Sequence, residues 1–119
     1  MRFFILFLML TLVAGAKTKV QPKRSDPTMT PATPLTISPD PGAHLRDRRP
    51  RIEMINDAFM AGSRRMQVDG VWVSLQTEGL SNYWRPAKPL APGRHRVAVG
   101  GTDEYGLNVD YRWEFFIDR

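Results

Sequence analysis

The stretch "MQVDGVWVS", Met66 to Ser74, decides the fold of this 119-residue chain. Two arms rich in β-forming residues flank the pair Asp69 and Gly70. That pair suits the left-handed conformations of a type I′ turn, so the stretch predicts a tight β-hairpin. The sequence from Leu35 onward continues in the same way, with short alternating runs separated by Pro and Gly and with no helical-period segment of useful length.

Further strands are predicted from the same alternation of apolar and polar residues. The runs that carry it are "LTI" at 35–37, "RIEMI" at 51–55, "NYWRP" at 82–86, "RHRVAV" at 94–99 and "DYRWEFFID" at 110–118. About seven short antiparallel strands with turn signals between them indicate an all-β, immunoglobulin-like two-sheet sandwich over residues 35–119. A small open barrel is the alternative architecture. In the last run, Trp113 and Phe115 are predicted to face the core and Phe116 the opposite side.

His95 lies between two arginines, and the strand period separates it from them. In "RHRVAV" His95 shares a face with Val97, while Arg94 and Arg96 point to the other face. A catalytic histidine needs a partner within hydrogen-bond reach. We therefore expect a histidine at the edge of the core, with one ring nitrogen bonded to backbone, in preference to a ligand or general base.

The N-terminal part of the chain indicates export. Residues 1–16 have the layout of a secretory signal peptide, with one cation, an apolar run and a small-residue cleavage pattern ending at Ala16. An uncleaved N-terminal anchor is the alternative, and no membrane span is predicted after cleavage. Residues 17–34, rich in Pro, Thr and Lys, are predicted to be a disordered linker. We expect a secreted, periplasmic or cell-surface protein.

The formal net charge of +5 is concentrated near the N-terminus. From Leu35 onward, twelve Arg and Lys residues stand against eleven Asp and Glu residues. The folded part is therefore nearly neutral, which argues against a nucleic-acid-binding domain. The chain has no cysteine, so no disulfide stabilises it.

Several segments follow one another in the order typical of a known family. They are "SPDPGAHLRDRRPRIEM" at 38–54, "MQVDGVWVS" at 66–74, "YWRPAKPLAPGRHRVAVGGTDEYG" at 83–106 and "WEFFID" at 113–118. This ordered set resembles the bacterial Ig-like modules of secreted and cell-surface proteins. The resemblance implies structural roles for the matched residues and no catalytic residue. Such modules act as spacers, stalks or binding units within longer proteins, whereas here the module follows a signal and a linker alone.

No catalytic or cofactor constellation is predicted. The chain lacks cysteine, a His-x-x-x-His pair, a Gly-x-Ser-x-Gly elbow and a phosphate loop, so we expect a protein that is not an enzyme and has no cofactor. Asp103 and Glu104 are expected to be solvated turn carboxylates in preference to calcium ligands.

A periplasmic copper carrier is the alternative function, because the chain loosely resembles small carriers that share a signal peptide, an Ig-like sandwich and His/Met ligands. The available soft or borderline ligands are His44, His95, Met54, Met60 and Met66. Those carriers have a histidine at the mature N-terminus, where this chain would have Lys17.

A binding surface is the preferred function. If Val71 and Val73 face inward, Trp72 faces outward and can form a platform for a sugar or a partner protein. Trp84 is a weaker candidate, and a twist or bulge could instead turn either tryptophan inward. Arg46, Arg48 and Arg49 form an arginine-rich loop that could engage an acidic polymer, although a solvated loop is the simpler interpretation. The sequence thus predicts a non-catalytic module of the cell envelope that binds a protein or polysaccharide.

Overall fold

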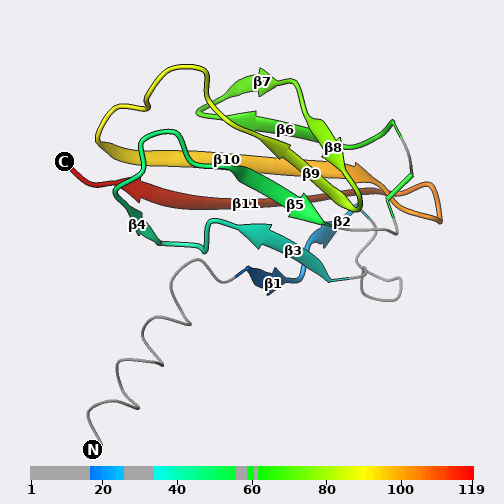
Figure 1. The fold of residues 1–119 in the computed structure, drawn as a ribbon. Helices are drawn as coiled ribbons and strands as arrows, with labels where there is room; N and C mark the ends of the chain where they lie inside the picture. Colours follow the sequence, from blue (N-terminus) through cyan, green and yellow to red (C-terminus); the bar gives the residue numbers. More distant parts are fainter. Residues whose placement is uncertain (1–16, 26–33, 56–58, 61) are drawn as a thin grey trace, which may run out of the picture.

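The computed structural model describes residues 17–25, 34–55, 59–60 and 62–119. Over these residues the chain is a sandwich of two β-sheets, and it forms no helix there (Figure 1). Sheet 1 has the strand order β1-β3-β5-β9-β8, and sheet 2 the order β2-β11-β10-β6-β7 with β4 beside β11. The strands of sheet 1 are β1 (Thr18–Val20), β3 (Leu35–Ser38), β5 (Ile52–Ile55), β9 (Ser81–Trp84) and β8 (Gln76–Glu78). Those of sheet 2 are β2 (Lys23–Arg24), β11 (Asn108–Ile117), β10 (Gly93–Thr102), β6 (Arg65–Val68), β7 (Val71–Val73) and β4 (His44–Leu45).

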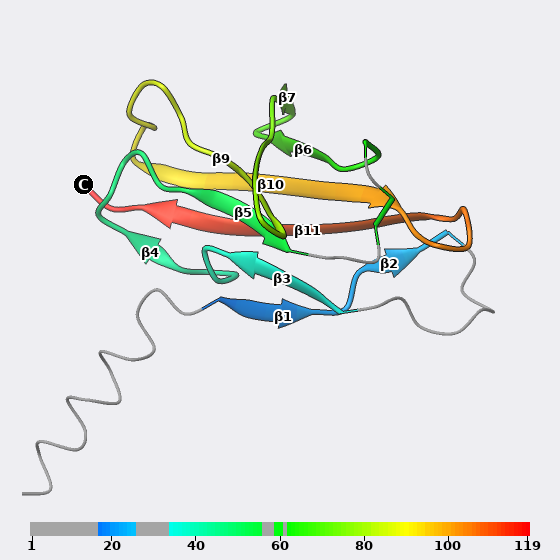
Figure 2. The ribbon, with the colours of Figure 1, turned by 45° about the vertical axis from the view of Figure 1, so that its right-hand side comes forward.

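The predicted fold class is confirmed, although the strands differ in number and length from the prediction. Strands β10 and β11 pair over ten residues each and form the long hairpin that crosses sheet 2 (Figure 2). The short pairings of β1, β2, β4 and β8 were not predicted, because strands of two or three residues carry too little alternation to detect. Neighbouring strands run antiparallel except β4, which is parallel to β11.

The central hairpin is confirmed in its predicted place. Strands β6 and β7 pair antiparallel around Asp69 and Gly70, whose φ values are 53° and 81°. Positive φ at both positions is the signature of the type I′ turn.

The core lies between the two sheets. Trp113 and Phe115 are buried from β11, as the alternation predicts, and Phe116 points to the opposite face. Met54 and Met66 are also buried there, where the flexible methionine side chain fills space between branched residues. The buried apolar residues are Leu35, Ile37, Ile52, Met54, Phe59, Met66, Val68, Val97, Val99, Val109, Trp113, Phe115 and Ile117.

The prediction of a disordered linker is wrong for the first part of residues 17–34. Strand β1 pairs with β3, and β2 pairs with β11, so this segment contributes an edge to both sheets. Backbone pairing at a sheet edge needs little apolar surface of its own, which is why composition did not reveal it. Residues 26–33, and the predicted signal at 1–16, lie outside the described residues. Where the structure describes the chain, it holds no helix long and apolar enough to cross a membrane.

Asp103 links the N-terminal strand β2 to the β10–β11 turn through hydrogen bonds. Its Oδ2 accepts a hydrogen bond from Arg24 Nε at 2.8 Å, and both side chains are buried. Its Oδ1 accepts bonds from the backbone N–H groups of Tyr105 and Leu107. Burial alone would raise the pKa of Asp103, but the bonds from Leu107, Tyr105 and Arg24 outweigh burial and lower it. The expectation of a solvated carboxylate at Asp103 is therefore wrong, while Glu104 is exposed.

Candidate binding surface

The outer face of sheet 2 consists largely of the alternate side chains of β10 and β11 that point away from the core. Alternation brings Arg94 and Arg96 to this face from β10, and Arg112 and Glu114 from β11. The register places Arg96 opposite Glu114 and Ala98 opposite Arg112. The residues that alternate with these are buried in the core, so the pleat fixes which side chains meet solvent.

A row of side chains crosses this face at right angles to the strands. Trp72 of β7 pairs with Gln67 of β6, Gln67 with Ala98 of β10, and Ala98 with Arg112 of β11. Paired residues of neighbouring strands project from the same face. Three strand spacings separate the ends of the row, so the backbones of Trp72 and Arg112 lie roughly 14 Å apart.

A shallow, open depression lies beside the row. It has a volume of about 770 Å³, and its lining includes Gln67, Ala98, Arg112 and Glu114. Ala98 is the smallest side chain of the row, so the surface is lowest between Gln67 and Arg112.

The charges around the depression do not cancel. Glu114 Oε2 lies 3.3 Å from Arg96 Nε and 3.8 Å from Arg94 Nη1. Glu114 therefore serves two guanidinium groups, and Arg112 adds a third positive charge, while the other carboxylate of the lining, Asp69, is paired with His95. The side chains of Arg96 and Arg94 are 65% and 53% exposed, which leaves most of their donors open to solvent.

Trp72 is exposed as expected, but the premise used to expect it is partly wrong. Its exposure is 62%, yet Val71 is also exposed and Val73 is half-buried. Strand β7 is the edge of sheet 2, so it reaches past the core and both valines lose the cover they would have in a central strand. Trp84 is half-buried and packs against the core from β9, so the structure does not place it beside Trp72.

The arginine-rich loop makes contacts with the protein itself. Arg48 Nε donates to the carbonyl oxygen of Leu90, and Arg49 Nε donates to that of Pro86, each at 2.9 Å. The N–H of Leu90 in turn donates to the carbonyl oxygen of Arg48 at 2.7 Å. These bonds hold the loop against residues 86–90, although Arg46, Arg48 and Arg49 are all exposed. Sequence reasoning chose this loop for its charge density and missed Arg94, Arg96 and Arg112, although the alternation already placed them on one face.

His95 stands at the core edge, and both of its ring nitrogens have partners. Nε2 lies 2.7 Å from the carbonyl oxygen of Ala91, which confirms the expected backbone bond. Nδ1 lies 2.7 Å from Asp69 Oδ2, and Asp69 Oδ1 accepts the N–H of Arg96 at 2.9 Å. Burial alone would lower the pKa of His95, but the acceptors Ala91 O and Asp69 outweigh burial and raise it. The pair joins the turn of the β6–β7 hairpin to β10.

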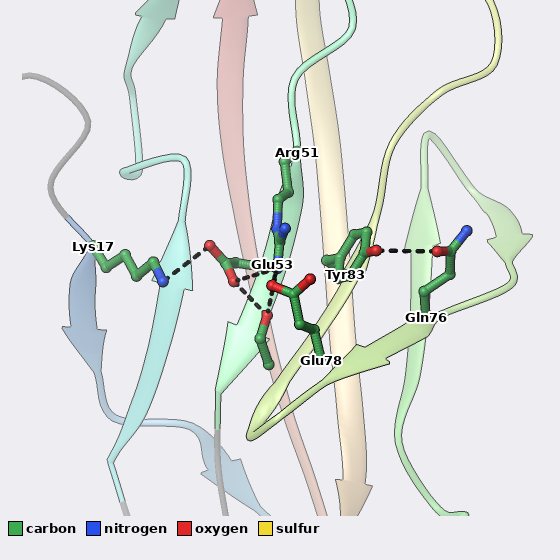
Figure 3. Close-up of polar contacts among 7 residues, drawn as sticks. Lys17, Arg51, Glu53, Gln76, Glu78 and Tyr83 are labelled. Atoms are coloured by element: carbon green, nitrogen blue, oxygen red, sulfur yellow. Dashed lines mark hydrogen bonds and ion pairs between the residues drawn. The ribbon is translucent and has the colours of Figure 1, made fainter.

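The outer face of sheet 1 is organised around a buried carboxylate (Figure 3). Glu53 of β5 lies 3.2 Å from Lys17 Nζ, accepts the Ser81 hydroxyl, and lies 3.7 Å from Arg51 Nη2. Burial alone would raise the pKa of Glu53, but Ser81, Lys17 and Arg51 together lower it. Lys17 thereby links the start of β1 to the centre of the sheet.

Arg51 extends the same network toward the edge of sheet 1. Its guanidinium lies over the ring of Tyr83 at 3.8 Å from the centroid, and its Nη2 lies 3.3 Å from Glu78 Oε1. The Tyr83 hydroxyl donates to Gln76 Oε1 at 3.1 Å (Figure 3). The charged groups of this cluster are thus matched to one another, and one face of the Tyr83 ring is covered by Arg51.

The candidate copper ligands are not brought together. His44 stacks on Phe116 and His95 on Phe115, and these neighbouring residues of β11 point to opposite faces of sheet 2. Met54 and Met66 are buried in the core, while Met60 is exposed. Among the described residues, no group of three His, Cys, Asp or Glu side chains could hold a metal ion. Within the part of the chain that the structure describes, the donors therefore do not form a copper site.

Comparisons with known proteins concern the fold. No protein-family model matches the chain, and no curated protein matches it. Among solved structures, CopC from Methylosinus trichosporium OB3b superposes with a TM-score of 0.57 at 15% sequence identity, covering 82% of this chain and 93% of that one. At this identity the likeness shows that the chain shares the two-sheet β-sandwich fold of that CopC.

Proposed function

We propose that this protein is a non-catalytic binding module of the cell envelope, which binds a polysaccharide or a protein through the outer face of sheet 2. The observation that carries the proposal is Trp72, which is 62% exposed at one end of a polar row beside a shallow depression. Indole presents a large, flat apolar area with a polar N–H at its edge, which is well suited to stack on the apolar face of a sugar.

The neighbours of Trp72 support a binding role. Gln67 can donate and accept hydrogen bonds, and Arg112 carries a planar fork of donors. A site for a polar polymer requires an aromatic ring for stacking. It also requires side chains that form hydrogen bonds with hydroxyls or carboxylates. The depression is open to solvent, so a polymer can reach these groups.

The predicted signal at residues 1–16 supports a location outside the cytoplasm, and so does the sandwich fold that the chain shares with a CopC. The absence of cysteine is compatible with an oxidising compartment.

The test is retention of the secreted chain on insoluble envelope polysaccharide and on immobilised envelope protein. Trp72→Ala is expected to lower retention at least several-fold while the melting temperature stays nearly unchanged. The matched control is Leu80→Ala, which truncates another exposed apolar residue, 57% exposed, in the β8–β9 turn of sheet 1. Equal retention of the wild type and Trp72→Ala on every material would contradict the proposal.

A copper carrier is the second candidate, and its support is the fold shared with CopC together with the loose resemblance to small copper carriers. The donor set described above does not favour it. Calorimetric titration of the secreted chain with Cu(II) is expected to give no heat of specific binding. Heat that is lost in both His44→Ala and His95→Ala would instead favour the carrier.

A further inference from the structure

Resting on the proposed function, we propose that the outer face of sheet 2 is a site for an acidic polysaccharide. A sugar ring of the polymer stacks on Trp72, and its carboxylates bind the guanidinium groups of Arg96 and Arg112. The inference goes beyond the proposed function because it names the ligand class and the groups that select it.

The excess of positive charge on this face is the first argument. Five cations, Lys23, Arg65, Arg94, Arg96 and Arg112, lie on it, against the strand carboxylates Asp110 and Glu114 and the turn carboxylate Asp69. The domain from residue 35 onward is nearly neutral, so this excess is a local arrangement. A guanidinium on a solvated sheet binds a carboxylate in a bidentate manner, which gives direction as well as attraction.

The position of Glu114 is the second argument. Its carboxylate is 41% exposed and lies between Arg96 and Arg94, at 3.3 and 3.8 Å. It occupies the place that a ligand carboxylate would take, and exposed ion pairs of this kind are weak. The carboxylates of an acidic polymer can replace Glu114 as the partners of Arg94 and Arg96. A neutral polymer has no carboxylates and cannot replace it.

The glycine at position 100 is the third argument. A Cβ placed on Gly100 would lie 3.0 Å from Arg65 Nη2, so the guanidinium of Arg65 lies across the bare backbone of β10. The lack of a side chain at Gly100 thus lets Arg65 lie on this face beyond Ala98. Arg94, Arg96, Arg112 and Arg65 together form a basic strip across the face. The row and the strip together suit an extended chain better than a compact small molecule.

The choice of polysaccharide over other polyanions follows from the aromatic content of the face. Nucleic-acid sites of this open kind stack successive bases on several aromatic side chains. The row offers the ring of Trp72 beside Gln67, which suit one sugar ring and its hydroxyls, and Phe116, which also points to this face, is covered by the His44 ring stacked on it. Anionic vesicles and nucleic acid enter the test as competitors.

The experiment measures binding of the secreted chain to immobilised polygalacturonate and to its fully methyl-esterified form, which has the same backbone without charge. Wild type is expected to bind the acidic polymer at least tenfold more tightly, with affinity falling as salt rises. The double variant Arg96→Ala/Arg112→Ala should lose most of that difference. Glu114→Gln should bind the acidic polymer several-fold more tightly and the ester unchanged. Arg85→Ala, which removes an exposed arginine just after β9 of sheet 1, is the matched control and should bind as wild type does.

The outcomes separate the two proposals. Equal binding to both polymers that depends on Trp72 would overturn the acidic ligand and leave the proposed function standing. Absence of binding to polygalacturonate, alongside Trp72-dependent retention on envelope material, would do the same. Displacement of the polymer by anionic vesicles or single-stranded nucleic acid at lower concentrations than by free polygalacturonate would overturn the choice of ligand class. If Trp72→Ala changes retention on no material, both proposals fail.

Discussion

The two outer faces of the sandwich carry similar residue types and use them in opposite ways. On sheet 1, Glu53 is buried among Lys17, Ser81 and Arg51, and its charge is matched within the protein. On sheet 2, the Glu114 side chain is 41% exposed and is shared by two arginines that are themselves more than half exposed.

The burial of the carboxylate distinguishes a structural charge cluster from a candidate binding site. A buried carboxylate must be satisfied by its neighbours, since an unpaired charge away from water is very costly. Its partners are therefore committed to it and to the fold. An exposed charged group without a full set of protein partners is hydrated by water. A ligand can replace that water without lowering the stability of the fold. The comparison predicts that the same kinds of substitution have different consequences on the two faces.

Among the charged residues of the two outer faces, the largest expected effect is on sheet 1. Glu53→Ala should lower the free energy of unfolding by about 1–3 kcal/mol, because it leaves the Ser81 hydroxyl and the Lys17 ammonium without their acceptor. Arg112→Ala, on the exposed face of sheet 2, should change it by less than about 0.5 kcal/mol. Urea denaturation of both variants measures the contrast. Equal losses would show that the two faces do not differ in the way proposed.

The next effect is on the pH dependence of stability. The folded-state pKa of His95 is raised above its ordinary value of 6.5, so its contribution is fully present below that value and is lost as the pH rises through the folded-state pKa. We expect a loss of about 1 kcal/mol from mildly acidic to mildly alkaline pH, the net size of one ordinary hydrogen bond. His95→Gln should flatten this part of the profile, followed as melting temperature against pH. A variant that keeps the wild-type slope would contradict the role given to the His95–Asp69 pair.

The carboxylates act in the opposite direction in the same profile. The pKa values of Glu53 and Asp103 are lowered from 4.5 and 3.8, so their contributions are present above these values and are lost as the pH falls through the folded-state pKa. Glu53→Gln should reduce the acid-side loss and leave the alkaline side unchanged.

The smallest effect on stability is expected at Trp72. Trp72→Ala should change the free energy of unfolding by less than about 0.5 kcal/mol, since the side chain already lies mostly in water. The same truncation at Trp113, which is 5% exposed in the core, should cost about 3–5 kcal/mol. Thermal or urea unfolding measures both. A large loss of stability in Trp72→Ala would show that Trp72 stabilises the fold. It would contradict the proposal that the outer face of sheet 2 is a binding face.

The sequence by itself determined the sandwich, the hairpin at Asp69 and Gly70, the inward face of Trp113 and Phe115, and the separation of His95 from Arg94 and Arg96. These follow from strand periodicity and from backbone conformations that few residues tolerate, both of which are local properties.

Only the tertiary structure decided which strands became edges and which charges found partners. Strand order made β7 an edge, which exposed Val71 beside Trp72, and long-range pairing drew Lys17 and Arg24 into contact with Glu53 and Asp103. Whether a charged side chain is a structural tie or an open group depends on residues distant in the chain. That is why the arginine loop appeared the better candidate in the sequence, and why the basic face of sheet 2 emerged when the strands were placed side by side.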